Sequence, residues 1–189
     1  VSNILQSLVN FAHGGSQTTT RLSVPFNLSQ CVDEAINLLS LGSNTPKICF
    51  ENRCSPEAVV EGDPQRMAQV FVNLLSNARD ASAPGAEVII SATIDEDLVI
   101  AAVQDIGAGV PPEQLKSIFD PFYTTKIPGR GTGMGLAIVT TIVEEHHGAI
   151  HAISPLATDR PGTRVEMRFP RYRQADATRP VEFANGSHS

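Results

Sequence analysis

Hydrophobic residues recur at helical spacing over residues 64–82, and this stretch organises the rest of the chain. At about 100° per residue, one stripe of the predicted helix carries the apolar side chains Met67, Phe71, Leu74, Leu75 and Ala78. Asp63 suits the N-cap because its carboxylate accepts from free amides, and Pro64 at the first helical position lacks only an N–H that would be unpaired. Pro84 and Gly85 end the helix near Ser82.

Two carboxamides and an acid form a polar strip along the edge of that apolar stripe. Asn73 and Asn77 stand four residues apart, and Asp80 follows three residues later. Asparagine is a mediocre helix former, so two of them beside a core need a reason. A carboxamide oxygen can bind magnesium and the amide nitrogen can donate to phosphate. Taken alone, the helix favours the simpler interpretation that both side chains face water.

The other patterns predict a chain that alternates between strands and helices. Helical spacing is found at residues 2–12, 28–41, 112–119 and 136–146. Gly42 is expected to close the second of these helices. Strand-like patterns occur at residues 22–27, 47–51, 59–61, 87–94, 98–104, 149–154 and 163–169. The strands at 87–94 and 98–104 are separated by three residues and predict an antiparallel hairpin.

An acid followed by two glycines stands where the second hairpin strand ends. Gly107 and Gly109 permit backbone conformations closed to other residues, and such loops commonly carry function. Asp105 could be a simple turn residue. If a purine lies beside it, its carboxylate can accept from the exocyclic amino group of adenine, whereas guanine would present another acceptor. This arrangement would select ATP over GTP.

A second glycine-rich run, GTGMG at residues 131–135, leads directly into the helix at 136–146. Alone it could be a plain turn, because it lacks the strand of a dinucleotide fingerprint and the ending of a P-loop. Backbone amides at a helix N-terminus nevertheless bind anions, so Gly133 and Gly135 can let the chain close over phosphates. Residues 120–131 before it are turn-rich and aperiodic, which is typical of a lid.

Composition narrows the possible partners. The 189 residues suffice for one well-cored domain with tails, and 41% are hydrophobic. No run approaches the roughly 18 apolar residues of a membrane helix, so we expect a cytoplasmic piece without membrane contact. The net charge of −6 includes no basic stripe and argues against nucleic acid. Three cysteines without CxxC spacing suggest reduced thiols in or near the core.

Four motifs stand in order along the chain: NLLSNARDA, DIGAGVP, IFDPFYTTK and GTGMGLAIV. With the Gly162-Thr163 pair that opens the last strand, they closely resemble the conserved boxes of the ATP-binding domain of sensor histidine kinases. That domain belongs to the superfamily that includes gyrase, heat-shock ATPase chaperones and mismatch-repair ATPases. The resemblance covers residues 27–170, and FDPFYTTK with GTGMGL looks most like the nitrogen-regulation type of kinase.

The resemblance implies a fold and a division of the chain. The fold would be an α+β two-layer sandwich, in which a mixed, mostly antiparallel sheet carries about three helices on one face. Residues 21–170 would form the ATP-binding catalytic domain and 171–189 a disordered tail. Residues 1–20 would be the end of a dimerisation helix and a linker, with the phosphoacceptor histidine upstream of Val1.

The resemblance also implies roles for individual residues, with ATP and Mg²⁺ as cofactors. Asn77 would bind magnesium with help from Asn73, Asp105 would bind the adenine amino group, and Lys126 would meet the terminal phosphate. Phe119 and Phe122 would hinge and anchor the lid, although simple core packing of both rings is a comparable alternative. The remaining implied nucleotide contacts are Gly107, Gly109, Val110, Ile118, Thr124, Gly131, Thr132, Gly133, Met134, Gly135, Leu136 and Thr163.

Two positions bear on how this chain would differ from others of the superfamily. Many related kinases carry lysine or another residue at the position of Asp80, so Lys126, with Arg130 as a possible helper, must supply the cationic phosphate contact. Hydrolytic relatives carry glutamate at the position of Asn73. Since asparagine cannot take a proton, we expect the isolated domain to be a poor ATPase.

The expected function is therefore transfer of the γ-phosphoryl group of Mg-ATP to a histidine, for relay to a response regulator. The partners would be the chain's own upstream hairpin and a receiver domain, with the isolated domain a monomer and the full-length kinase a homodimer. None of the histidines present lies in the expected helical context. Two alternatives stay open, namely a non-catalytic ATP-sensing module and an ATP-hydrolysing clamp.

Overall fold

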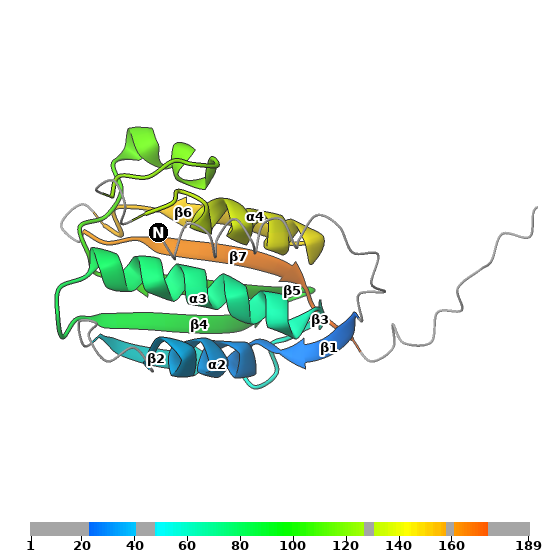
Figure 1. Ribbon diagram of the computed structural model, residues 1–189. Coiled ribbons are helices and arrows are strands. Elements are labelled where there is room, and N and C mark those ends of the chain that lie inside the picture. The colour runs from blue at the N-terminus through cyan, green and yellow to red at the C-terminus, as the bar shows by residue number, and fades with distance from the viewer. Residues whose placement is uncertain (1–22, 41–47, 127–130, 158–160, 174–189) are drawn as a thin grey trace, which may run out of the picture.

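Three helices cover one face of a five-stranded sheet (Figure 1). The computed structural model describes residues 23–40, 48–126, 131–157 and 161–173. The helices are α2 (Leu28–Ser40), α3 (Pro64–Ala81) and α4 (Gly135–Glu145). This arrangement confirms the predicted two-layer sandwich.

The main sheet is mixed and mostly antiparallel, as predicted. Its strands, in spatial order, are β2 (Cys49–Cys54), β4 (Glu87–Asp95), β5 (Leu98–Asp105), β7 (Arg164–Pro170) and β6 (Ala149–Ile153). The pair β2 and β4 is parallel, and the other three pairs are antiparallel. Alternate residues of β4, namely Val88, Ile90 and Ala92, are fully buried against the helices. The period-2 pattern of the sequence therefore sets which face of the sheet is covered.

Helix α3 lies in the middle of the helical layer and begins and ends as the sequence predicts. The Asp63 carboxylate accepts from the backbone amides of Gln65 and Arg66, and Pro64 follows it. The predicted apolar stripe is buried, with 4% or less exposure at each of Met67, Phe71, Leu74, Leu75 and Ala78. Burying five such side chains contributes on the order of several kcal/mol, which fixes the rotation of the helix on the sheet.

The first and third strands form a separate two-stranded sheet. β1 (Val24–Asn27) pairs antiparallel with β3 (Val59–Gly62), and β1 continues directly into α2. Phe26 and Val60 from this pair are buried in the common core. The small sheet thus closes one end of the helical layer.

The segment after the Asp105 loop differs from the prediction. Residues 112–119 were expected to form one short helix, but the structure has two 3₁₀ turns, η1 (Pro112–Gln114) and η2 (Ser117–Phe119). Each holds only three residues and neither has a fully buried residue, so no apolar stripe favours a continuous α-helix here. The helix expected at residues 2–12, Gly42, and the tail beyond residue 173 lie outside the described residues.

The three cysteines are free thiols, and they differ in burial. Burial raises the pKa of the Cys31 thiol and of the Cys54 thiol to about 12 in each case. Both therefore match the expectation of reduced thiols in or near the core, whereas Cys49 is exposed.

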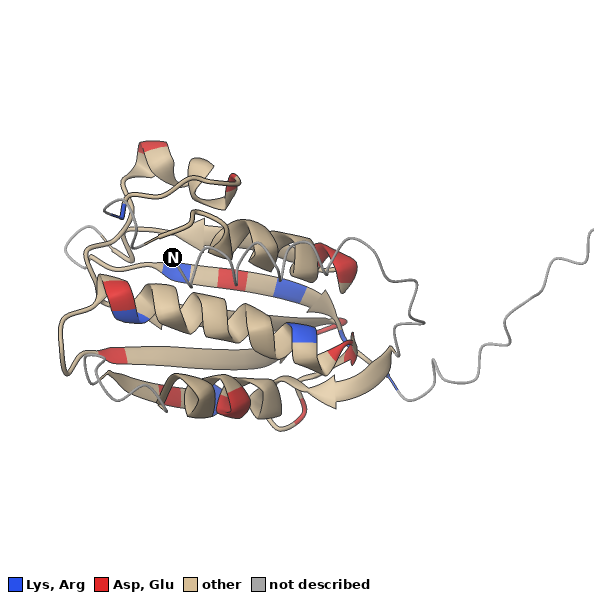
Figure 2. Cartoon of the chain, viewed as in Figure 1, with Lys and Arg blue, Asp and Glu red and all other residues tan. Residues whose placement is uncertain are grey.

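Acidic and basic residues are interspersed along the helices and strands coloured in Figure 2. On β7 the three residues Arg164, Glu166 and Arg168 alternate in charge, and the Glu166 carboxylate accepts from both guanidinium groups.

None of the helices in the described part of the chain combines the length and the hydropathy that a membrane crossing requires.

His146 is a buried link between the end of α4 and the start of α3. Its Nε2 atom accepts from the backbone amide of Asp63 at 3.0 Å, and its Nδ1 atom lies 2.7 Å from the carbonyl oxygen of Ile142. Because Nε2 accepts, the ring proton lies on Nδ1, which donates to that carbonyl. A Cβ atom on Gly62 would lie 2.1 Å from the ring, so only glycine lets β3 pass this close.

Replacing His146 with alanine should lower the free energy of unfolding by about 1–3 kcal/mol, because the Asp63 amide would lose its acceptor inside the protein. Urea unfolding of the two proteins measures the difference. The matched control is His147→Asn, since His147 is exposed and asparagine tolerates its positive φ of 57°. A His146→Ala protein as stable as this control would contradict the structural role.

Candidate functional site

A buried carboxylate stands at the end of β5. Asp105 is only 6% exposed, and its Oδ1 atom accepts from the backbone amide of Gly107 at 2.8 Å. Burial raises the pKa of this carboxyl, and the amides of Gly107 and Thr163 partly oppose that effect. A buried carboxylate is stabilised by each donor that it accepts from. The site is therefore suited to a ligand that brings an N–H group.

The loop after Asp105 is held by close backbone approaches that only glycine allows. A Cβ atom on Gly107 would lie 2.3 Å from the carbonyl oxygen of Ala81, at the end of α3. Gly162 has φ +122°, and a Cβ atom there would lie 2.3 Å from the carbonyl oxygen of Asp105. The loop is thus pressed between the end of α3 and the segment that leads into β7.

Ser154 is a structural residue of this site that the sequence patterns did not predict. Its hydroxyl accepts from the backbone amide of Val110 at 2.8 Å and donates to the carbonyl oxygen of Gly162 at 2.7 Å. Gly109 adopts φ +77° beside the same hydroxyl. A serine directly after a strand and before Pro155 is typical of a side chain that bonds to nearby backbone. This pattern was therefore a usable signal for Ser154.

The two carboxamides of α3 face the start of α4. A Cβ atom built on Gly135 would lie 3.9 Å from Asn73 Oδ1 and 3.9 Å from Asn77 Nδ2. Both asparagines are half-buried, so neither side chain lies wholly in water. The Nδ2 atom of Asn73 is buried and has no hydrogen-bond partner among the described residues. A buried donor without an acceptor is costly, which favours an acceptor supplied by a ligand.

The N-terminus of α4 offers backbone amides to the same space. Its N-cap residue, Met134, makes no side-chain capping bond, and the Met134 amide itself donates to the Thr132 hydroxyl at 3.3 Å. Free amides and the positive end of the helix dipole make such a terminus suitable for an anion. The GTGMG run therefore leads into a helix terminus that is suited to an anion.

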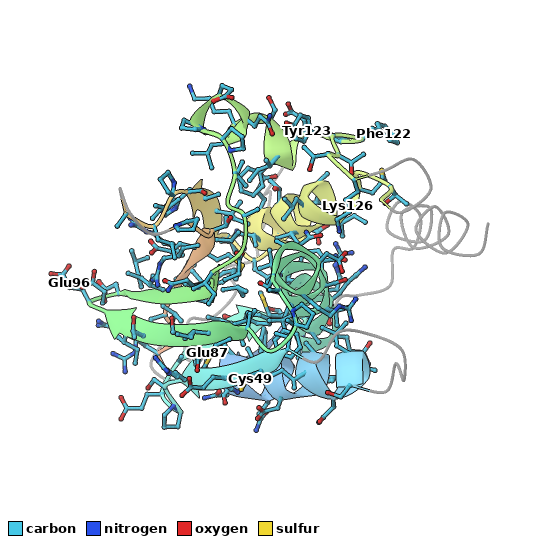
Figure 3. All side chains as sticks on the ribbon, turned by 90° about the vertical axis from the view of Figure 1, so that its left-hand side faces the viewer. Cys49, Glu87, Glu96, Phe122, Tyr123 and Lys126 are labelled. Atoms are coloured by element: carbon cyan, nitrogen blue, oxygen red, sulfur yellow. The ribbon has the colours of Figure 1, made fainter. Side chains whose placement is uncertain are left out.

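Lys126 reaches from the lid segment to the last turns of α3, and Figure 3 labels it beside that helix. Its Nζ atom donates to Asp80 Oδ2 at 2.6 Å and to Asn77 Oδ1 at 3.3 Å. The lysine of the third motif and the second asparagine of the first motif are thus in contact, as a shared phosphate and metal site requires.

The lid is attached to the glycine run through backbone rather than through an aromatic ring. The amide of Phe122 donates to the Gly133 carbonyl at 2.9 Å, and a Cβ atom on Gly133, at φ +66°, would lie 2.3 Å from the Phe122 carbonyl carbon. Phe122 is 71% exposed, and its side chain points away from the domain (Figure 3). The alternative that Phe122 packs in the core is therefore wrong, while Phe119 is half-buried.

The remaining predicted contacts come from the loops next to β5, β7 and α4, from η2 and from α4 itself. Gly131 approaches the lid closely, since a Cβ atom there would be 2.8 Å from the Thr124 hydroxyl. Thr163 gives its carbonyl oxygen to the Asp105 amide at 2.9 Å. Arg130 lies outside the described residues. Half-buried apolar side chains that can line a base pocket are Val110, Ile118 and Leu136.

These donors fit a magnesium nucleotide better than a metal held by protein alone. Within the described ranges no three His, Cys, Asp or Glu side chains gather as a metal site. The carboxamide oxygen of Asn77 can nevertheless serve as one hard ligand, and magnesium commonly completes its shell with phosphate oxygens and water. The unpaired Asn73 amide and the free amides of α4 can receive those phosphates.

Comparison with known proteins agrees with this geometry. Residues 62–173 match the family model described as "Histidine kinase-, DNA gyrase B-, and HSP90-like ATPase". The chain belongs to this family. The match begins just before α3, includes all four motifs and ends after β7.

Curated proteins that resemble the chain are named as kinases. Sporulation kinase A of Bacillus subtilis (strain 168) is 35% identical over 146 residues, which are 77% of this chain and 23% of that protein. Sensor histidine kinase ZraS of Salmonella typhimurium is 38% identical over 154 residues, or 79% of this chain and 30% of that protein. The chain thus spans less than a third of the length of either relative.

Solved structures of family members share the fold. The mycobacterial sensor histidine kinase MprB gives a TM-score of 0.69 at 28% identity, covering 79% of this chain and 97% of that one. The catalytic domain of histidine kinase ThkA gives 0.67 at 28% identity, covering 79% and 95%. The resemblance to histidine kinase ATP-binding domains is confirmed, whereas the nitrogen-regulation subtype and the boundaries at residues 20 and 170 stay predictions.

We expect Asp105→Asn to raise the Kd for ATP at least about tenfold. The new amide nitrogen would face the adenine amino group, from which the carboxylate is expected to accept a hydrogen bond. Calorimetric titration with ATP measures the change. The control Asp95→Asn removes one exposed carboxylate at the far end of β4 and should leave the Kd unaltered. Equal affinity of Asp105→Asn and the unmodified domain would remove base recognition from this residue.

Proposed function

We propose that this chain is the ATP-binding catalytic domain of a two-component sensor histidine kinase. The domain would promote transfer of the γ-phosphoryl group of Mg-ATP to a histidine on a dimerisation domain outside this chain. The observation that supports this most strongly is that three motifs meet at α3: Lys126 donates to Asn77, Gly135 lies near both carboxamides, and the loop after Asp105 approaches the Ala81 carbonyl closely. Relatives named as sensor histidine kinases agree with it.

In this proposal the base and the phosphates are held by different elements. Asp105 accepts from the adenine amino group, with Val110, Ile118 and Leu136 as apolar walls. Asn77 supplies an oxygen to magnesium, which when bound neutralises phosphate charge. The remaining phosphate and lid contacts would come from Asn73, Gly107, Gly109, Phe119, Phe122, Thr124, Lys126, Gly131, Thr132, Gly133, Met134, Gly135 and Thr163.

Positioning and charge neutralisation would do most of the catalytic work, as in other phosphoryl transfers. Lys126 would place a point charge at the terminal phosphate. Asn73 has no proton-accepting group, so water would not be activated and hydrolysis would be slow. The domain would therefore hold its nucleotide until a histidine is presented.

The acceptor histidine is proposed to lie upstream of Val1, on the dimerisation hairpin. His146 is buried and committed to Asp63 and Ile142, which excludes it as an acceptor. His151 lies on β6 beside Glu166 at 3.6 Å, in a strand rather than a helix. The second partner would be a receiver domain, and the setting cytoplasmic, with a homodimeric full-length kinase and a monomeric isolated domain.

The two other functions remain distinguishable by experiment. An ATP-sensing module would bind ATP tightly without passing on phosphate, and an ATP-hydrolysing clamp would release phosphate at a substantial rate alone. The intact set of four motifs argues against the first. Asparagine at position 73 argues against the second.

Mixing the domain with its separately produced dimerisation hairpin and γ-labelled ATP should yield acid-labile, base-stable label on the hairpin. Asn77→Ala should reduce the labelling rate at least about a hundredfold, because magnesium would lose its protein ligand. Glu144→Gln, an exposed change on α4, serves as control. Tight ATP binding without labelling would instead support the sensor, and rapid phosphate release sensitive to Asn77→Ala would support the clamp.

A further inference from the structure

The Lys126 ammonium occupies a cation position between two side chains of α3. It lies 2.6 Å from Asp80 Oδ2 and 3.3 Å from Asn77 Oδ1. Oxygen atoms of a carboxylate and a carboxamide are also the ligands and water acceptors that magnesium uses. The protein's own cation therefore lies where the proposed function requires a metal and its hydration shell.

Helix stability does not account for Asp80. It lies in the last turn of α3, where a negative charge is unfavourable to the helix dipole. Its Oδ1 atom is 3.6 Å from Arg79 Nε, a side chain only 15% exposed, so the carboxylate stands between two cations. This position suits a carboxylate whose neutralising cation differs between the state without nucleotide and the state with nucleotide.

We propose that Asp80 makes nucleotide binding depend on a divalent cation, an inference that rests on the proposed function. Without nucleotide, Lys126 neutralises Asp80. When Lys126 turns to a phosphate, the carboxylate loses that partner while the triphosphate adds further negative charge nearby. A divalent ion held by Asn77 compensates both, since Asp80 stands less than one helical turn further along the same face.

Asp80 is thus a positioning residue that discriminates Mg-ATP from metal-free ATP. It opposes metal-free ATP through repulsion and through the lost Lys126 pair, and it favours the complexed form by attracting the hydrated metal. A merely structural role, in which Asp80 only orients Lys126, would affect both forms of ATP alike. The two roles therefore differ in the ratio of two affinities rather than in either affinity alone.

The test compares the Kd for ATP in Mg²⁺ with the Kd in EDTA, by calorimetry on the whole chain. In Asp80→Asn, which keeps the shape and removes the charge, the ratio of metal-free to magnesium Kd should fall about fivefold, the scale of a half-exposed ion pair. Most of this change should be tighter binding of metal-free ATP. The control Glu113→Gln removes an exposed charge on η1 and should keep the ratio of the unmodified chain.

Two results would overturn the inference, and they differ in what else they overturn. If the unmodified chain binds Mg-ATP and Asp80→Asn changes both Kd values by the same factor, the discriminating role of Asp80 is wrong and the proposed function stands. If the unmodified chain binds ATP in neither solution, the proposed function fails together with the inference.

Discussion

Burial of one apolar stripe on α3 determines where the polar groups of the site can lie. Phe71, Leu74 and Leu75 are almost fully buried against the sheet, and this fixes the rotation of the helix about its axis. Once that rotation is fixed, Asn73 and Asn77 must stand at the border with α4. The core and the site are therefore two faces of the same helix, and a change that turned α3 would move both.

A second constraint is the close packing of backbone around the Asp105 loop. Gly107 rests on the end of α3, and Gly162 rests on the carbonyl of Asp105 itself. Ser154 then connects the two sides through its hydroxyl. These contacts hold a carboxylate in a buried position, where its raised pKa shows the cost of desolvation and where a matched donor gains the most.

Sequence patterns predicted those parts of the fold that depend on local chemistry. The limits of α3 follow from Asp63 and Pro64, and the hairpin of β4 and β5 follows from alternating apolar residues. The separate pairing of β1 with β3 and the parallel pairing of β2 with β4 were not predicted, because strand partners depend on long-range packing.

The site was predictable to a similar degree. The resemblance in four motifs named Asn77, Lys126 and Gly135, which the fold does bring together. It did not reveal that Phe122 would be held by its backbone with its ring exposed, or that Lys126 would pair with Asp80. Those features depend on how the lid lies on α3, and nothing in the spacing of the motifs specifies that.

A crystal structure of the domain with Mg²⁺ and a non-hydrolysable ATP analogue would test the proposed nucleotide site most directly. We predict the adenine amino group on the Asp105 carboxylate and the metal on Asn77 Oδ1, with the phosphates between α3 and the first turn of α4. An analogue bound elsewhere, or a base that does not touch Asp105, would contradict it.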